Sequence, residues 1–155
     1  MDARTTAKTP NELVEMLTAW LHDEVWPDLT GYAHGMPEPS NDRSVDRTPF
    51  FVVTASAGTY GYGVASTTII IGVQVESDAK DAMRTYAWAC QRLRDKIYQL
   101  GQALYRAPVG LVFGCRPHEL TWSIPTAQPR PQWQAQITIP FDLPGMAPDN
   151  GEFLV

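Results

Sequence analysis

The chain has little cysteine, no long apolar run and no excess of positive charge. Only 2 cysteines occur in 155 residues. Cys90 and Cys115 stand in apolar surroundings without paired spacing, so the sequence predicts neither a disulfide framework nor a zinc site. No apolar stretch approaches the roughly 20 residues that cross a bilayer, and the polar residues 1–9 do not resemble a signal peptide. We therefore expect a protein that is made in the cytoplasm and associates with no membrane.

Positive charge is scarce over the chain as a whole. Lysine and arginine number 12 against 17 aspartate and glutamate residues, giving a formal net charge of −5. Such a balance argues against general affinity for a phosphate backbone. A local cluster of Arg84, Arg92, Arg94 and Lys96 falls on one expected helix, where mixed charges favour a solvated face. Hydrophobic residues make up 44%, and the length fits one globular domain, residues 1–155.

The first helix has clear sequence signals. Thr9 is a suitable N-cap, Pro10 fits the first helical position and Glu12 fits the capping-box position. Apolar residues then recur at helical spacing until Pro27 ends the pattern. The next segment, 27–49, is rich in proline, glycine and polar residues, so we expect a long loop that orders on a partner.

Strands and a long helix follow. Residues 50–55 and 67–75 are rich in β-branched and aromatic residues and predict a hairpin with an extended glycine-rich tip at 58–63. Ser77 and Asp78 offer an N-cap for a helix of about 26 residues that ends near Gly101 or Pro108.

The last third of the chain returns to strands. A short apolar run occupies 111–113, and the segments 120–124 and 133–141 alternate with period two. A stiff proline-rich turn, 125–132, joins the last two, and residues 144–155 are expected to form a flexible tail.

These elements predict an α+β fold. Their order is helix, hairpin, long helix, hairpin, which favours an antiparallel or mixed sheet of about four to five strands with both helices packed on one face. The opposite face would be rich in Thr, Gln and Ser and free for solvent or a neighbouring subunit.

The sequence contains no convincing catalytic or cofactor site. The glycine-rich tip is flanked by strands on both sides, whereas a phosphate cradle precedes a helix N-terminus. Cys115, His118 and Glu119 form the one cluster with nucleophile chemistry, but a simply exposed histidine at a turn is the preferred interpretation. His22 and His34 lack a partner at metal-ligand spacing. We expect no enzyme activity, no metal and no cofactor.

Several aromatic residues favour protein contacts instead. Tyr60 and Tyr62 at the tip would give a partner a large contact area at low entropic cost. One or two of the 5 tryptophans are expected as interface anchors, and the rest as core residues.

The chain resembles the tail-terminator (tail-completion) proteins of long-tailed bacteriophages over residues 10–144. The likeness includes the strand 67–75 that runs into a helix beginning at Asp78, and the helix 86–104 with Arg92-Leu93-Arg94 at its centre. Its most distinctive part is Gln128-Pro129-Arg130-Pro131-Gln132-Trp133, which is similar to a Gln-Pro-x-Pro-x-Trp turn before the final strand.

The resemblance implies a structural virion protein of the phage neck. Such proteins form a ring, typically a hexamer, on the last ring of the tail tube, where they end polymerisation and provide the head–tail joining surface. The implied partners are other copies of this chain, the tail tube protein and a head-side connector, while double-stranded DNA passes through the lumen without specific binding. By analogy, subunit or partner contacts would come from the loops and tail: Tyr60, Tyr62, Arg130, Gln132, Trp133, Phe153 and Leu154.

Three alternatives remain open from the sequence. The chain could be another neck protein, such as a head-completion protein or the terminator of a contractile tail. It could be a small enzyme that uses Cys115 or His118, or a monomeric binder of a small ligand.

Overall fold

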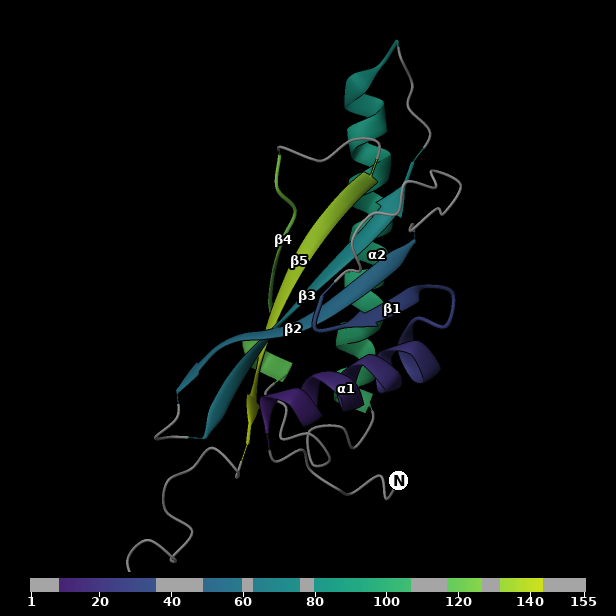
Figure 1. Ribbon diagram of the computed structural model, residues 1–155. Helices are drawn as coiled ribbons and strands as arrows, with labels where there is room; N and C mark the ends of the chain where they lie inside the picture. Colours follow the sequence, from purple (N-terminus) through teal and green to yellow (C-terminus); the bar gives the residue numbers. More distant parts are fainter. Residues whose placement is uncertain are drawn as a thin grey trace, which may run out of the picture.

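The computed structural model describes residues 9–35, 49–59, 63–75, 80–106, 117–126 and 132–143. These residues form a five-stranded mixed sheet, with strand order β1-β2-β3-β5-β4, and two α-helices (Figure 1). The predicted α+β class is confirmed.

The sheet is built from two hairpins and one added edge strand. β1 (Thr30–Ala33) runs parallel to β2 (Phe50–Thr59), and β2 is antiparallel to β3 (Val64–Gln74). β3 is also antiparallel to β5 (Gln132–Asp142), whose other edge carries the short strand β4 (Thr121–Ser123). The expected hairpins are thus present, and the apolar strand β3 lies at the centre of the sheet.

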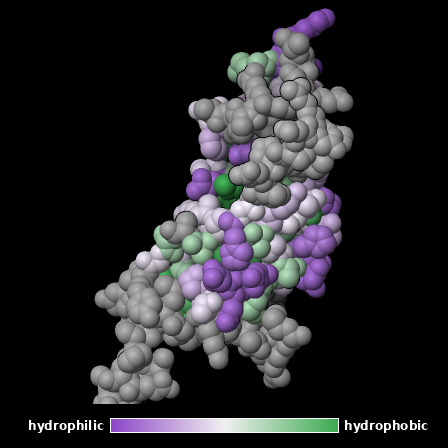
Figure 2. Space-filling model, in the orientation of Figure 1, coloured by the Kyte–Doolittle hydropathy of each residue, from purple (hydrophilic) through white to green (hydrophobic). Residues whose placement is uncertain are grey.

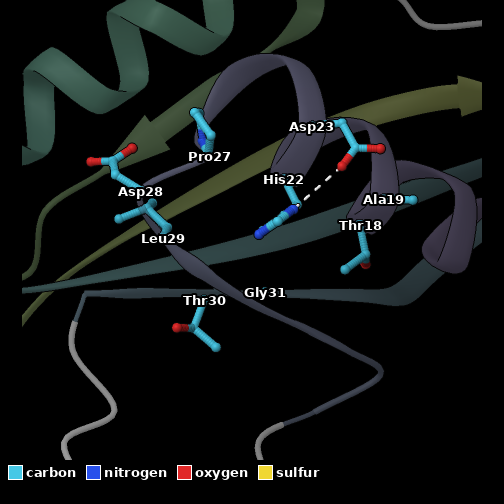
Figure 3. Close-up of a pocket in the computed structure, with 9 residues that line it drawn as sticks. All are labelled: Thr18, Ala19, His22, Asp23, Pro27, Asp28, Leu29, Thr30 and Gly31. Atoms are coloured by element: carbon cyan, nitrogen blue, oxygen red, sulfur yellow. Dashed lines mark hydrogen bonds and ion pairs between the residues drawn. The ribbon is translucent and has the colours of Figure 1, made fainter.

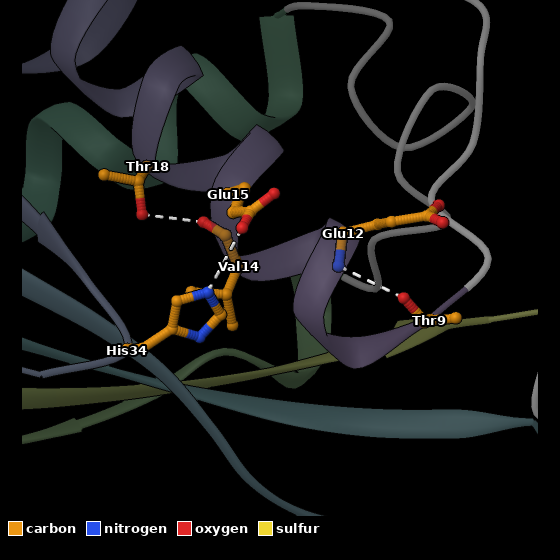
Figure 4. Close-up of polar contacts among 6 residues, drawn as sticks. All are labelled: Thr9, Glu12, Val14, Glu15, Thr18 and His34. Carbon is orange, nitrogen blue, oxygen red and sulfur yellow. Dashed lines mark hydrogen bonds and ion pairs between the residues drawn. The ribbon is translucent and has the colours of Figure 1, made fainter.

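The first helix follows its sequence signals closely. α1 (Pro10–Trp20) begins after Thr9, whose hydroxyl accepts a hydrogen bond from the backbone N–H of Glu12 over 3.2 Å (Figure 4). It continues into a π-helical turn, η1 (Leu21–Val25), in which the Trp26 N–H bonds to the Leu21 carbonyl. The helix therefore ends before Pro27, as predicted.

The long helix α2 (Ala82–Arg106) spans 25 residues. The expected N-cap at Ser77 and Asp78 is wrong, because Asp81 takes that place. Its carboxylate accepts a hydrogen bond from the Arg84 backbone N–H over 2.9 Å. A short 3-10 helix, η3 (Pro117–Glu119), precedes β4.

The core lies on one face of the sheet, and both helices pack there. Val53, Ile69 and Ile137 sit side by side across β2, β3 and β5 on that face. They belong to one buried cluster with residues of α1, η1 and α2: Leu13, Val14, Leu17, Leu21, Ala89, Leu93, Ile97, Leu100 and Leu104. The prediction that the helices share one face is confirmed.

Three expectations about the sheet need correction. The predicted loop 27–49 contains β1, because Gly31 pairs opposite Phe51 and its missing side chain leaves room for that ring. The opposite face is also less polar than expected near β2. Phe50 and Val52 point to that face yet are only 2% and 4% exposed. The glycine-rich tip is shorter than predicted, since β2 reaches Thr59 and β3 begins at Val64.

Candidate interaction surfaces

The outer face of α2 carries large apolar side chains that the core does not cover. Met83, Tyr98 and Tyr105 are 84%, 68% and 66% exposed. Successive residues of an α-helix are about 100° apart, so five residues that follow Met83 point within about 60° of one another on this face. We call them the α2 stripe: Ala87, Arg94, Tyr98, Gly101 and Tyr105. Tyrosine is enriched at protein interfaces because it combines a large apolar ring with a polar tip.

The first turn of α2 places an arginine over an aromatic ring. The Arg84 guanidinium carbon lies 5.8 Å from the centre of the Trp88 ring. The Arg84 Nε atom is also 3.6 Å from a carboxylate oxygen of Asp81, so its orientation is fixed from two sides. Trp88 remains 44% exposed. Figure 1 shows that this end of α2 extends beyond the strands of the sheet.

The outer side of α1 and η1 has the opposite charge. Residues 9–35 contain no lysine or arginine, and four exposed acidic residues form what we call the acidic face: Glu12, Glu15, Asp23 and Glu24. Glu15 lies 3.6 Å from His34 Nε2 (Figure 4), and Asp23 lies 3.3 Å from His22 Nδ1. Both histidine side chains are about half exposed, so the face remains open to solvent.

A shallow depression of about 530 Å³ lies beside the acidic face (Figure 3). It is lined by Thr18, Ala19, His22, Asp23, Pro27, Asp28, Leu29, Thr30 and Gly31. The Thr18 hydroxyl donates to the Val14 carbonyl over 2.6 Å, within its own helix.

An ion pair connects the acidic segment to α2. Lys96 Nζ lies 2.6 Å from Asp28 Oδ2. Partial burial raises the pKa of the Asp28 carboxyl, but the hydrogen bond and the positive charge of Lys96, with a backbone hydrogen bond, outweigh it and leave this pKa below its ordinary value of 3.8. A second depression, of about 380 Å³, lies close by between Glu24 and Val25 of η1 and Tyr98 and Arg106 of α2.

The sheet face away from the helices is polar at its centre. Thr54, Thr68, Thr138 and Thr121 stand opposite one another across β2, β3, β5 and β4. Figure 2 shows the molecule with the strands in front of α2, and the described residues there form a mixture of hydrophilic and hydrophobic areas. The predicted row of polar residues is therefore present, although Phe50 and Val52 interrupt it toward β1.

Most of the residues that the sequence offered as partner contacts lie outside the described residues: Tyr60, Tyr62, Arg130, Phe153 and Leu154. Gln132 begins β5, where its backbone pairs with Gln74. Trp133 is described in full and is only 3% exposed; its ring lies 5.7 Å from that of Tyr86, nearly edge-on. Trp133 thus belongs to the core, and little of its surface is open to a partner.

Of the cluster Cys115, His118 and Glu119, the structure describes the last two residues. His118 and Glu119 are exposed in η3, and Cys115 lies outside the described residues. Cys90 is buried, and hydrogen bonding to it is the main reason that the pKa of the Tyr86 hydroxyl is raised above 10.0. Within the described ranges, no three His, Cys, Asp or Glu side chains are placed to hold a metal ion.

The sequence interpretation missed Tyr98 and Tyr105. The signal was available, because both lie on the face of the long helix that its apolar core pattern leaves to solvent. No helix in the described part of the chain is long and apolar enough to span a membrane. No protein-family model and no curated protein sequence matches the chain.

Proposed function

We propose that this chain is a structural virion protein that forms a ring on the end of a bacteriophage tail tube. The ring, a hexamer by resemblance, ends tube polymerisation and provides the surface to which the head side joins. The observation that carries the proposal is the α2 stripe. Two tyrosines more than half exposed, on a helix held rigidly against a sheet, are typical of a surface that another protein covers.

Further features support an assembly role. Trp88 and Met83 extend the exposed apolar surface to the start of α2. The polar row of threonines on the far side of the sheet gives the same subunit a second, chemically different surface. A ring of identical subunits needs two different complementary surfaces on each copy.

The proposed partners are other copies of the chain, the tail tube protein and a head-side connector, and the proposed location is the tail and neck of the virion. DNA would pass through the lumen without specific binding, in keeping with the net charge of −5. We propose no enzyme activity and no cofactor.

The test is the mass of the purified chain by light scattering over a range of concentrations, with and without tail tubes. A ring of about six copies, the size that the resemblance implies for a closed head-to-tail assembly, or a monomer that assembles only on tube ends, supports the proposal. A monomer that is indifferent to tubes at every concentration contradicts it.

A matched pair of variants connects this result to the α2 stripe. Tyr98→Ser should weaken assembly, because it removes an exposed ring from the stripe. Gln99→Ser alters the neighbouring exposed residue outside the stripe and should assemble as the unaltered chain does. Binding to isolated connector but not to tubes would instead favour a head-side neck protein.

A further inference from the structure

The two helical surfaces differ in the sign of their charge. The described residues of α2 carry Arg84, Arg92, Arg94, Lys96 and Arg106 against the single acidic residue Asp95. The acidic face on α1 and η1 has no basic residue in its segment. Lys96 and Arg84 have acidic neighbours in the same subunit, Asp28 and Asp81. Arg94 adds exposed positive charge to the α2 stripe. Arg106 lies about 120° around the axis from Arg94 and lines the second depression together with Glu24.

The two surfaces also match in length. Arg94 to Tyr105 covers the same number of residues as Glu12 to Asp23, at most about 17 Å at 1.5 Å per residue. Tyr98 lies within this length of the stripe, and Tyr105 lies at its end. Between Glu15 and Asp23 stands Ala19, a small exposed residue that leaves room for a ring.

Gly101 leaves the α2 stripe without a side chain between its two tyrosines. No atom lies within 4 Å of the position that a Cβ would take there. A second helix could therefore approach the α2 backbone closely at this point, since small residues permit close approach of helices.

We infer that the α2 stripe of one subunit binds the acidic face of α1 and η1 on a second copy of this chain. Tyr98 and Tyr105 would lie over Ala19, and Arg94 would face the carboxylates. The inference rests on the proposed ring, whose subunit contact it identifies.

Charge decides between this arrangement and the symmetric one. Pairing the α2 stripe with itself would place Arg94 of each copy against a surface that carries no carboxylate, so this charge would gain no complementary partner. Pairing unlike surfaces makes a head-to-tail contact, which generates a closed ring when the rotation between subunits closes.

Charge reversal with mixing tests the inference. Arg94→Glu makes both surfaces acidic, and Glu15→Lys with Asp23→Lys makes both basic, so neither variant should assemble alone. We expect the concentration of half-assembly to rise about tenfold or more in each, the usual scale for loss of an interfacial charge pair. An equimolar mixture should assemble again, because each variant then meets a complementary partner.

The matched control is Arg92→Glu. It makes the same charge change on the same helix, about 160° around the axis from Arg94, and should leave assembly unchanged. Gly101→Gln provides a steric test: it fills the gap in the stripe and should prevent assembly. Since no atom surrounds that position, the thermal unfolding temperature of the Gly101→Gln variant should not fall.

The results of these experiments test the inferred subunit contact and the proposed function separately. If the unaltered chain forms rings and neither reversal weakens them, the inferred contact is wrong and the ring proposal stands. If both reversals weaken the ring but the mixture does not recover, α2 and α1 do not face each other, and the contact is again wrong. If the unaltered chain neither forms rings nor caps tubes, the proposed function fails together with the contact.

Discussion

Trp26 donates a hydrogen bond from its indole Nε1 to the backbone carbonyl oxygen of Lys96, over 3.1 Å. The same ring lies 5.4 Å from that of Phe51 in β2, tilted by 57°. One fully buried side chain therefore joins the end of η1, the middle of α2 and the sheet. This contact holds the acidic face and the α2 stripe in a fixed relation, which two surfaces of a ring subunit require.

Replacing Trp26 should strongly destabilise the fold. Trp26→Ala opens a cavity and removes a hydrogen bond, so the free energy of unfolding should fall by about 3–5 kcal/mol. Trp26→Phe keeps most of the packing and should cost about 1–2 kcal/mol. Urea denaturation followed by circular dichroism measures both. Trp88→Ala is the control: that ring is half exposed and loses mainly its contact with Arg84, about 0.5–1 kcal/mol. Equal losses at the two tryptophans would refute the structural role of Trp26.

The Asp28–Lys96 ion pair should contribute stability that depends on pH. The folded-state pKa of Asp28 lies below 3.8, so the folded protein favours the ionised carboxylate. The contribution is therefore complete above the unfolded pKa and is lost as the pH falls through the folded one. The difference in stability between the unaltered chain and Asp28→Asn should be present at pH 7 and disappear in the acid range below pH 3.8.

That difference should be modest, because Asp28 is 60% exposed. Solvent screening limits exposed pairs to roughly 1 kcal/mol or less. Denaturation at pH 7 and at pH 3 provides the comparison. A gap that widens on acidification would mean that Asp28 is not stabilised as a carboxylate. Asp95→Asn, which alters the exposed aspartate of α2 next to Lys96, is the matched control.

Much of the fold could be predicted because local signals and burial agree. Thr9 and Pro10 predict the start of α1, and in the structure they are its N-cap and its first residue. The regular alternation of apolar and polar residues in β5 follows from burial of only one of its faces. For residues 50–53 the sequence could not predict which side chains face the helices. Both faces of this segment are buried, so no alternation remains to show which side chains meet the helices.

β1 was missed for a different physical reason. In Thr30–Ala33 the strand-favouring Thr30 and Tyr32 alternate with glycine and alanine, which strands disfavour, so the segment gives no clear strand signal. The strand exists because its backbone pairs with β2 and because Gly31 admits the ring of Phe51. Information of that kind lies in the partner strand and not in the segment itself.

Replacement by alanine should lower the stability of the protein at Gly72 in the sheet and raise it at Gly101 in α2. A Cβ at Gly72 would overlap the ring of Phe50, which is directly opposite in β3's neighbour β2 and only 2% exposed. Gly72→Ala should therefore destabilise the protein by about 1–3 kcal/mol. Gly101→Ala meets no atom within 4 Å and should stabilise it by about 0.5–1 kcal/mol, the usual helix preference for alanine.

A second substitution checks the cause of the Gly72 effect. If the ring of Phe50 is responsible, Phe50→Leu should cost less in the Gly72→Ala background than in the unaltered chain. A double-mutant cycle of urea denaturations measures that coupling. Strictly additive effects would mean that the glycine is required for another reason.

The sequence predicted the type of residue that would form the candidate partner contacts, but not which residues. An assembly surface with aromatic residues was expected, but the aromatic residue chosen in the described part of the chain was Trp133. The alternating sequence pattern of a strand is the same whether its tryptophan packs against the helices of its own subunit or against a neighbouring subunit. Only the packing of Tyr86 of α2 against it decides that Trp133 is internal.

Trp133 and Tyr98 should therefore separate folding from assembly. Trp133→Ala should lower the free energy of unfolding by about 3–5 kcal/mol, because it removes a large ring from the core. Tyr98→Ser should change that free energy by no more than about 0.5 kcal/mol, since the side chain lies on the surface, while weakening assembly in light scattering. Urea denaturation below the assembly concentration isolates the stability term. A Trp133→Ala protein that unfolds like the unaltered chain but fails to assemble would place this indole in a subunit contact after all.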